Sequence, residues 1–198
     1  MKGVLLGHSF VKGLYDHLHY INASHTLSSQ SIAYALRLSN VSPSIDLLGY
    51  RGASTTSILR SANQTLKSIH PDFVIIDLGS NDLKDGQEPL SVAARLIELA
   101  NHLISSIQVK VVVLCSALPR GNPSTCTHLY NQIYRFNGYL KNFCAVESRI
   151  VFWLHKGFWQ KPISAWSRDS VHPNTHLGRH LYKRSIRAAT FRAVQMIG

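Results

Sequence analysis

The chain has 198 residues, of which 45% are hydrophobic, and its 21 lysines and arginines stand against 10 acidic residues, a formal net charge of +11. This length suits one domain over residues 1–198 that is large enough to bury a core, with no room for a second. No apolar stretch approaches the roughly eighteen residues of a membrane span, which argues against a transmembrane protein. The N-terminal apolar run is too short for a signal peptide, so we expect mature sequence from the start.

Five apolar runs, each bounded by turn residues, predict buried strands at 4–6, 44–50, 72–79, 110–118 and 149–154. Stretches with helical spacing lie between and after them, at 10–18, 55–69, 89–107, 126–142 and 175–196. The segment SIAYALRLS, at 31–39, is a candidate for a further helix. Because strand and helix alternate throughout, we predict a doubly wound parallel sheet with right-handed crossovers.

Polar loops follow four of these strands: Gly7-His8-Ser9, Gly49-Tyr50-Arg51-Gly52, Gly79-Ser80-Asn81-Asp82 and Asp169-Ser170-Val171-His172. Open parallel sheets bind ligands beyond the carboxyl ends of their strands, so we expect the four loops to converge. Together they hold a hydroxyl nucleophile, a glycine whose N–H can approach a ligand, an amide side chain, and a carboxylate three residues before an imidazole. Acyl transfer needs this set of groups.

In this interpretation Ser9 is the nucleophile, His172 takes its proton, and Asp169 holds the tautomer of the imidazole. The backbone N–H groups of Ser9 and Gly52 and the side-chain amide of Asn81 form the oxyanion hole. Each loop also has an ordinary interpretation when taken alone. A serine between a strand and a helix is often an N-cap, SND is an ordinary polar turn, and DSVH is a loop with a surface histidine.

The four loops resemble the motif blocks of the SGNH or GDSL hydrolases, a family named for its catalytic Ser, Gly, Asn and His. GHSF is similar to the first block, GYRGAST to the second, LGSND to the third, and DSVHPN followed by Gly178 to the fifth. The likeness runs from residue 3 to about 180. It implies the roles already given: Ser9 as nucleophile, Ser9, Gly52 and Asn81 as oxyanion donors, and Asp169 with His172 as the base pair.

Two positions depart from the family pattern. His8 stands where the first block usually has aspartate, and Ala53 stands where the second block commonly has aspartate. The family aspartate supports the loop, and an imidazole nitrogen can replace those hydrogen bonds. We also count His8 as a candidate pocket residue. The stretches LGHSFVKGL and HKGFW further resemble the esterase-like sequences of animal retrotransposon first-ORF proteins.

The segment FWLHKGFWQKPISAW, at 152–166, interleaves aromatic and basic residues and leads directly to Asp169 and His172. We therefore place Trp159 in the substrate pocket, facing an acyl chain or stacking on exposed bases. The alternative is that Trp153, Phe158 and Trp159 simply pack this connection onto the sheet.

Histidines at 172, 176 and 180 have a spacing of four residues, but Pro173 and Asn174 predict a helix start between the first and the second. Two histidines without a carboxylate or thiol make a poor zinc site, so we predict no metal. No phosphate-binding loop motif is present and no cofactor is implied.

Cys115, Cys126 and Cys144 form no CxxC pair, and their odd number argues against a disulfide framework. We expect a reducing compartment, the cytoplasm, and a buried thiol at Cys115. Near the C-terminus, Arg179, Lys183 and Arg187 recur every four residues and define one helical face. That face is either solvated or a contact surface for nucleic acid or anionic membrane, while Tyr182, Ile186 and Ala189 can pack inward.

These observations predict a three-layer α/β/α domain with a five-stranded, flavodoxin-like parallel sheet. We predict a serine esterase that hydrolyses a small-molecule or lipid ester, with a short acyl or acetyl group, through an acyl-enzyme. The alternative is a weak or inactive esterase fold that binds nucleic acid or anionic membrane through its basic surface. The sequence leaves the oligomeric state open.

Overall fold

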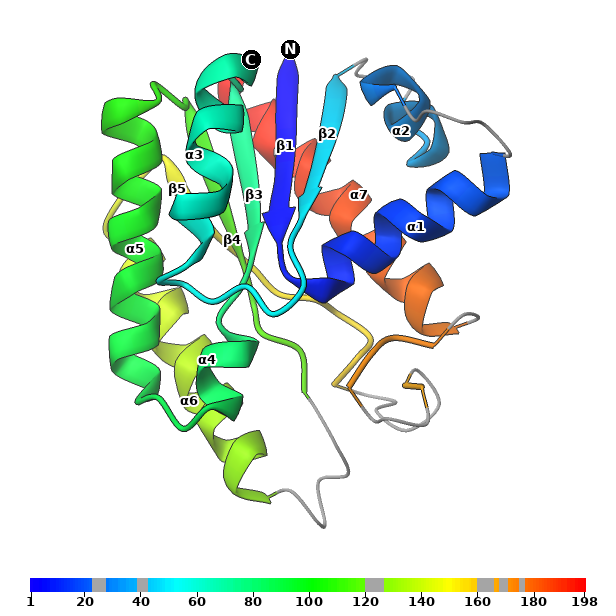
Figure 1. Cartoon of the computed structure of the whole chain (residues 1–198). Coiled ribbons are helices and arrows are strands. Elements are labelled where there is room, and N and C mark those ends of the chain that lie inside the picture. Colours follow the sequence, from blue (N-terminus) through cyan, green and yellow to red (C-terminus); the bar gives the residue numbers. More distant parts are fainter. Residues whose placement is uncertain (23–27, 39–42, 120–126, 160–165, 168–170, 175–176) are drawn as a thin grey trace.

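The computed structural model describes residues 1–22, 28–38, 43–119, 127–159, 166–167, 171–174 and 177–198. At its centre are five strands: β1 (Lys2–Gly7), β2 (Ser44–Gly49), β3 (Phe73–Asp77), β4 (Val111–Cys115) and β5 (Ile150–Trp153). All neighbours pair in parallel, in the order β2-β1-β3-β4-β5 (Figure 1). Each strand coincides with one of the five apolar runs, so the predicted flavodoxin-like sheet is confirmed.

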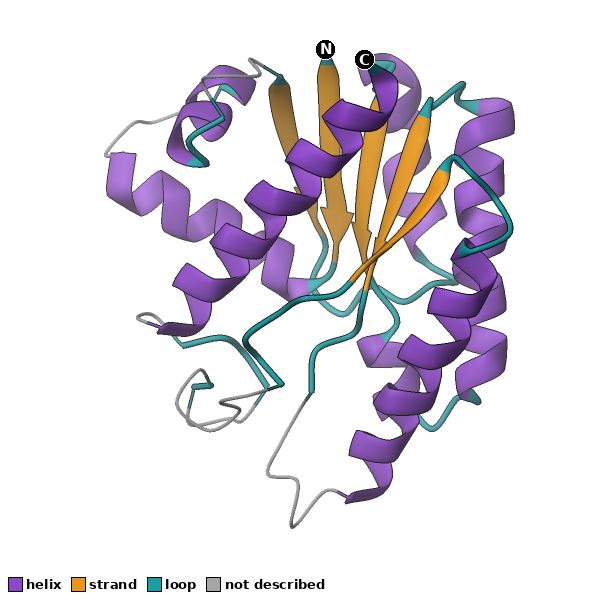
Figure 2. Ribbon diagram, turned by 180° about the vertical axis from the view of Figure 1, so that it is seen from behind, coloured by secondary structure: helices purple, strands orange, loops and turns teal. Residues whose placement is uncertain are grey.

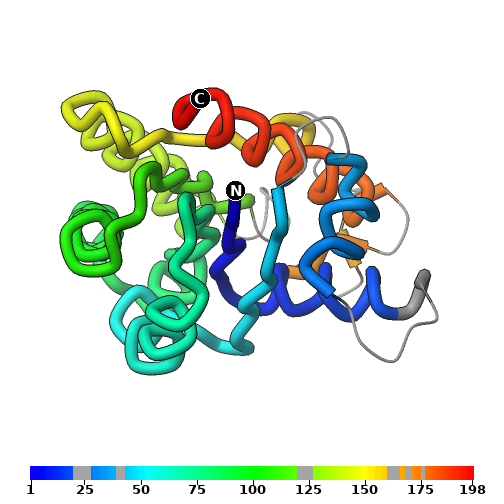
Figure 3. Tube along the Cα trace, turned by 90° about the horizontal axis from the view of Figure 1, so that it is seen from above, coloured from blue at the N-terminus to red at the C-terminus, as the bar shows by residue number. Residues whose placement is uncertain are grey.

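Helices cover both faces of the sheet (Figures 2 and 3). One face carries α3 (Ile58–Ile69), α4 (Ser80–Lys84), α5 (Pro89–Ser106) and α6 (Thr127–Cys144), and the other carries α1 (Ser9–Asn22), α2 (Ser29–Ala35) and α7 (Leu177–Ile197). Successive residues of a strand point to opposite faces, so Val4 and Leu6 join one apolar core while Leu5 joins the other. The candidate helix at 31–39 exists as α2, which begins after Ser28 caps the N–H of Ser31.

The carboxyl ends of β1, β2 and β3 lie together at the lower edge of the sheet in Figure 1. The chain order reverses at β1, which has β2 on one side and β3 on the other. Ligands bind at such switch points because the connections leave in opposite directions and open a crevice. Ser9, Gly52 and Asn81 follow these three strands, so the fold brings the first three predicted loops together.

Helix α4 differs from the predicted elements, which held no helix at Ser80-Asn81-Asp82. It begins after Gly79, whose φ of 101° is left-handed. A Cβ on Gly79 would lie 2.8 Å from the ring of Phe136, so a larger residue would not fit. A helix of five residues is too short to leave a periodic apolar pattern, which explains why the sequence did not reveal it.

The basic face predicted on α7 is half-buried at each of its three positions: Arg179, Lys183 and Arg187. Burial, and then the charge of Arg37, lower the pKa of Lys183, and the Arg187 guanidinium lies 5.3 Å from the ring centre of Phe191. This face is therefore not fully solvated. The inward face is buried as predicted, at Tyr182, Ile186 and Ala189.

Two cysteines in the described part of the chain are free and buried, Cys115 and Cys144. Burial raises the pKa of Cys144 to about 12 and, together with the Asp77 carboxylate, raises the pKa of Cys115 well above its usual value. The prediction of an inert buried thiol at Cys115 is confirmed, while Cys126 lies outside the described residues. None of the described helices combines the length and the apolar character needed to cross a membrane.

His155 lies fully buried in the connection after β5. Its Nδ1 is 2.7 Å from Oγ of Ser185, and its backbone N–H donates to Oγ of Ser116. Burial lowers the pKa of His155 to about 3, so the folded protein keeps the ring neutral where the unfolded chain would protonate it. We expect this residue to withdraw about 1.4 kcal/mol of stability per pH unit as the pH falls from about 6.5 towards 3.

Urea unfolding of wild type and His155→Gln between pH 7 and pH 4.5 measures this contribution, because the other titrating groups are common to both proteins. The variant should have the flatter dependence of unfolding free energy on pH. His70→Gln, at an exposed position, is the matched control and should follow wild type. Parallel curves for wild type and His155→Gln would contradict the buried neutral ring.

Candidate active site

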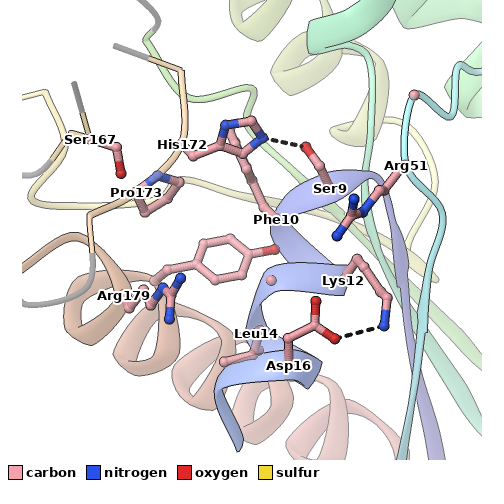
Figure 4. A pocket seen from close by; sticks show the side chains of 13 residues that line it. Ser9, Phe10, Lys12, Leu14, Asp16, Arg51, Ser167, His172, Pro173 and Arg179 are labelled. Atoms are coloured by element: carbon pink, nitrogen blue, oxygen red, sulfur yellow. Dashed lines mark hydrogen bonds and ion pairs between the residues drawn. The ribbon is translucent and has the colours of Figure 1, made fainter. Parts of the chain in front are cut away.

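Ser9 is the first residue of α1 and lies directly beyond the carboxyl end of β1. Its Oγ is 3.1 Å from Nε2 of His172, a residue 163 positions later in the chain. Figure 4 shows the two side chains facing each other. At this separation a hydroxyl can pass its proton to an imidazole. The structure therefore brings the predicted nucleophile and the predicted base together.

His8 is the residue that caps α1. Its carbonyl accepts the first helical hydrogen bond, from the N–H of Lys12 at 3.2 Å, and its Nδ1 accepts from the N–H of Phe10 at 3.4 Å. These are the two bonds of an N-cap residue, with a ring nitrogen in the place of a carboxylate oxygen. The hydroxyl of Ser9 is thus not the cap of its helix, and its hydrogen bond goes to His172.

A buried polar chain supports His8. The bond from Phe10 uses the lone pair of Nδ1, so the ring proton belongs on Nε2, which lies 3.0 Å from Oγ of Ser80 and 3.7 Å from Oδ1 of Asp77. Oδ2 of Asp77 accepts a 2.5 Å hydrogen bond from the Tyr182 hydroxyl. Burial, and then the Asp77 carboxylate, raise the pKa of Tyr182, which keeps that hydroxyl protonated as a donor.

This buried polar network indicates that the aspartate of the family pattern does not fit at position 8 of this protein. His8→Asp would place a second carboxyl group beside Asp77, and both positions are 1% exposed. Two buried carboxylates repel unless one takes up a proton. We expect the free energy of unfolding to fall by about 1–3 kcal/mol at pH 7.

Urea unfolding of His8→Asp with and without Asp77→Asn tests the clash. The double variant should regain most of the loss, because an amide at position 77 carries no charge and still accepts from Tyr182. The deficit should also shrink at pH 5, where a shared proton is easier to acquire. If His8→Asp matches wild type at pH 7, the carboxyl groups do not interact.

The loop after β2 brings Gly52 to the same cavity as Ser9. Gly49, the last residue of β2, makes the approach possible: a Cβ there would lie 2.3 Å from the backbone nitrogen of Lys12, so α1 packs directly on the strand. Gly52 itself has a φ of 70°. Within the described residues, the backbone N–H groups of Ser9 and Gly52 have no acceptor, which leaves both available to a ligand.

Asp82 holds the Gly52 loop in its conformation through hydrogen bonds with Thr55. Its carboxylate is fully buried and accepts hydrogen bonds from the backbone N–H of Thr55 at 3.1 Å and from the Thr55 hydroxyl at 2.7 Å. Arg95 lies 3.7 Å from the same carboxylate and donates to the Thr55 hydroxyl at 2.9 Å. Asp82 of α4 and Arg95 of α5 therefore hold this loop in place through Thr55.

Asn81 ties the same loop from a second point. Its Nδ2 donates a 2.9 Å hydrogen bond to the carbonyl of Ala53, the residue after Gly52. The side-chain amide thus lies next to the Gly52 backbone, as an oxyanion hole built from both would require. This bond holds the loop beside Gly52, and Asn81 itself is not among the residues that line the cavity.

A cavity of about 560 Å³ opens beside Ser9 and His172. Its described walls come from the first turns of α1, from the loop residues Arg51 and Gly52, and from Ser167, His172, Pro173, Arg179 and Tyr182. Figure 4 shows this cavity from close by. The volume is that of a site for a small organic ligand.

Three predicted site residues remain: Asp169, His8 and Trp159. Asp169 is outside the described residues, so its distance from His172 is not part of the structure. His8 lies beneath the site and is not among the residues that line the cavity. The same holds for Trp159, which is half-buried and packs edge-on against Tyr130 of α6. Phe158 is fully buried, so the packing alternative is correct for that aromatic residue.

No role was predicted from the sequence for Asp77 or for the hydroxyl of Tyr182. One signal was available: Asp77 ends the otherwise apolar run of β3, FVIID, and every residue of that strand is buried. A charged residue in a fully buried strand must have a partner, because an unpaired buried charge is strongly unfavourable. Nothing in the sequence identified the partner, which lies 105 residues away on α7.

Comparison with protein families gives one match that spans most of the chain: the sequence model of the GDSL-like lipase/acylhydrolase family matches residues 5–179. No protein among the curated sequences matches.

Several solved structures share the fold. An acetyl esterase mutant solved with acetate has a TM-score of 0.74 at 14% identity, and all of both chains is covered. A GDSL-like lipase from Bacteroides thetaiotaomicron has a TM-score of 0.69 at 16% identity, covering 100% of this chain and 89% of that one. A lipase/acylhydrolase from Enterococcus faecalis has a TM-score of 0.67 at 20% identity, covering 94% and 93%.

Proposed function

The chain belongs to the GDSL-like lipase/acylhydrolase family, and on that premise we propose that it is a serine esterase acting on a carboxylic ester through an acyl-enzyme. The observation that carries the proposal is the 3.1 Å contact between Oγ of Ser9 and Nε2 of His172, two residues that only the fold brings together. An exposed imidazole that accepts from a serine hydroxyl beside a cavity is the arrangement of an activated nucleophile.

The proposed reaction begins when Nε2 of His172 takes the proton of Ser9 as Oγ attacks the ester carbonyl. The tetrahedral intermediate collapses, the carbon–oxygen bond to the alcohol breaks, and His172 gives its proton to the departing alcohol oxygen. Water then gives a proton to His172 and attacks the acyl-serine. The bond between the acyl carbon and Oγ of Ser9 breaks, His172 returns its proton to Oγ, and the acid is released. Asp169 is proposed to hold the proton of Nδ1 and to stabilise the imidazolium.

The oxyanion of the intermediate is proposed to accept from the N–H groups of Ser9 and Gly52 and from the amide of Asn81. The first two donors have no acceptor within the described residues, and Asn81 lies beside Gly52 through its bond to Ala53. Donors that are held in place before the reaction need no reorganisation when the charge develops.

An acetyl or other short acyl group is the proposed substrate class. It rests on the neighbours of the same fold, which include proteins described as an acetyl esterase and an acetyl xylan esterase. A panel of p-nitrophenyl esters from acetate to decanoate tests it, and the highest kcat/KM should fall on the shortest chains. A rise in kcat/KM towards decanoate would point to a lipase instead.

Labelling with a fluorophosphonate probe tests the proposed chemistry itself. The probe phosphonylates an activated serine, so peptide mass spectrometry should place the adduct on Ser9. Labelling of an unrelated serine instead of Ser9, or no labelling of the native protein at all, would contradict the proposed function.

Asn81→Ala is expected to lower kcat by about 10²–10³ while the protein remains folded. The variant removes one oxyanion donor and also the bond that holds Ala53 beside Gly52. Steady-state kinetics on p-nitrophenyl acetate, with circular dichroism to check folding, measure the effect. Asn142→Ala at an exposed position of α6 is the matched control. Unchanged turnover in Asn81→Ala would remove this residue from the mechanism.

A second candidate function is binding of nucleic acid or anionic membrane by a catalytically weak esterase fold. The net charge of +11 is the observation that favours it. Affinity for RNA that falls steeply with salt, in a protein that shows no fluorophosphonate labelling, would support this candidate. The likeness of LGHSFVKGL and HKGFW to animal retrotransposon proteins belongs to the same proposal. A cytoplasmic location of the protein is a separate proposal, which rests on the odd number of cysteines and the lack of a CxxC pair.

A further inference from the structure

The cavity beside Ser9 is lined by three cationic side chains, Lys12, Arg51 and Arg179, and by one acidic side chain, Asp16. The described walls therefore carry an excess of two positive charges. An ester that carries no charged group offers these cationic side chains no anion with which to form an ion pair. The chemistry of the wall points to a charged substrate.

Lys12 and Asp16 neutralise each other. They stand one helical turn apart on α1, and Nζ of Lys12 lies 2.7 Å from Oδ1 of Asp16. Figure 4 shows this pair on the floor of the cavity as drawn, away from the Ser9 hydroxyl. The carboxylate of Asp16 is thus already paired with Lys12, and it does not neutralise the charges of the two arginines.

Arg51 has no hydrogen bond or ion pair to any of the described residues. It belongs to the loop after β2 and immediately precedes Gly52, the proposed oxyanion donor. Figure 4 shows its guanidinium between Ser9 and Lys12, turned towards the cavity. A guanidinium is planar and presents a fork of N–H donors that matches a carboxylate or a phosphate.

Arg179 approaches the cavity from the start of α7. Its Nη1 lies 3.4 Å from Nδ1 of His17. Burial, and then the charges of Arg179 and Lys183, lower the pKa of His17, so this contact is to a neutral ring. Among the described residues, Arg179 therefore has no acidic partner that would neutralise its charge.

We propose that the substrate is an ester that carries an anionic group, a carboxylate, sulfate or phosphate, bound in the cavity beside Ser9 by Arg51 and Arg179. This inference rests on the proposed esterase function and adds the class of its substrate. The volume of about 560 Å³ accommodates a small ester with one such group. The two arginines act on binding and specificity, while Ser9 and His172 perform the chemistry.

Two matched pairs of esters test the proposal and locate the anion. The first pair differs in the alcohol: 4-acetoxybenzoate is anionic and 4-acetoxybenzamide is neutral. The second differs in the acyl group: the p-nitrophenyl monoester of adipic acid is anionic and p-nitrophenyl hexanoate is neutral. Wild type should have a kcat/KM at least about tenfold higher for the anionic member of one pair, since a charge-assisted hydrogen bond contributes that much.

Arg51→Gln and Arg179→Gln should each lower this selectivity ratio by about tenfold, and Arg51→Lys should retain part of it. Arg60→Gln is the matched control, because it removes an arginine from an exposed position of α3 that does not line the cavity. It should keep the wild-type ratio, which separates the cavity from the general field of a protein with a charge of +11. A ratio near one in both pairs, or arginine variants that keep the wild-type ratio, would overturn the proposal.

A binding measurement separates this inference from the proposed function. Calorimetry on Ser9→Ala, without turnover, compares 4-hydroxybenzoate with neutral 4-hydroxybenzamide, and the anionic monoamide of adipic acid with neutral hexanamide. Preferential binding of the anions that is lost in the Arg51→Gln background supports the anion site even if no ester is hydrolysed. Hydrolysis that depends on Ser9 but shows no anion preference in kinetics or binding leaves the esterase standing and refutes the anion site.

Discussion

Replacing Ser9 by alanine is expected to lower kcat for ester hydrolysis by on the order of 10⁶, to the level set by the oxyanion donors and binding alone. The expectation follows from position. Ser9 lies at the start of α1 with its Oγ 3.1 Å from Nε2 of His172, and the helix cap is provided by His8 instead. Because the Ser9 hydroxyl does not cap α1, its loss should affect activity far more than the free energy of unfolding.

Steady-state kinetics on p-nitrophenyl acetate and urea unfolding should be measured on the same preparations. Ser9→Ala should lose turnover and fluorophosphonate labelling while its unfolding midpoint stays near wild type. Ser68→Ala, at an exposed position of α3, is the matched control and should leave both unchanged. Full activity in Ser9→Ala would end the claim that this serine is the nucleophile. A large drop in its unfolding midpoint would mean that the hydroxyl has a structural role that the geometry does not reveal.

The sheet could be predicted because its strands are buried on both faces. Such strands appear in the sequence as short continuous apolar runs, as in FVIID of β3 and VVVLC of β4, and the helices between them have a different period. The alternation of the two patterns then leaves few topologies. The observed order β2-β1-β3-β4-β5 is one of them.

The loops of the site could be predicted for a related reason. In a parallel sheet the carboxyl ends of all strands meet at one edge, so residues that follow different strands become neighbours. The order of the strands and loops therefore predicts, without any knowledge of side-chain geometry, that Ser9 lies near Gly52, Asn81 and His172. It could not distinguish a residue in the cavity from one beneath it, which is why His8 and Trp159 were assigned to a pocket that they do not line.

Contacts between a strand and a helix far away in the chain could not be predicted from the sequence. The hydroxyl of Tyr182 meets Asp77 across 105 residues, and the predicted basic face of α7 is half-buried. Helical periodicity gives the faces of α7 but does not say how the helix is rotated against the sheet. That rotation decides whether Arg179 points to solvent or into the cavity, and so it decides the charge that a substrate meets.

His172→Ala is expected to reduce kcat by on the order of 10⁶, as much as the loss of Ser9, because the two residues work as one unit. The hydroxyl of Ser9 is a weak nucleophile until a base takes its proton, and the side chain within hydrogen-bonding distance of Oγ is that of His172. The double variant Ser9→Ala, His172→Ala should therefore be little slower than either single variant. Losses that multiply instead would mean that the two side chains act independently.

His180→Ala provides the matched control, since it removes an exposed imidazole from the first turns of α7 without touching the cavity. It should retain wild-type kinetics. Fluorophosphonate labelling of His172→Ala separates the two candidate functions. An adduct on Ser9 that disappears with His172 requires a base-activated serine and therefore an enzyme. Equal labelling with and without His172, or no labelling of either protein, is the outcome expected of a fold that has kept the residues but not the chemistry.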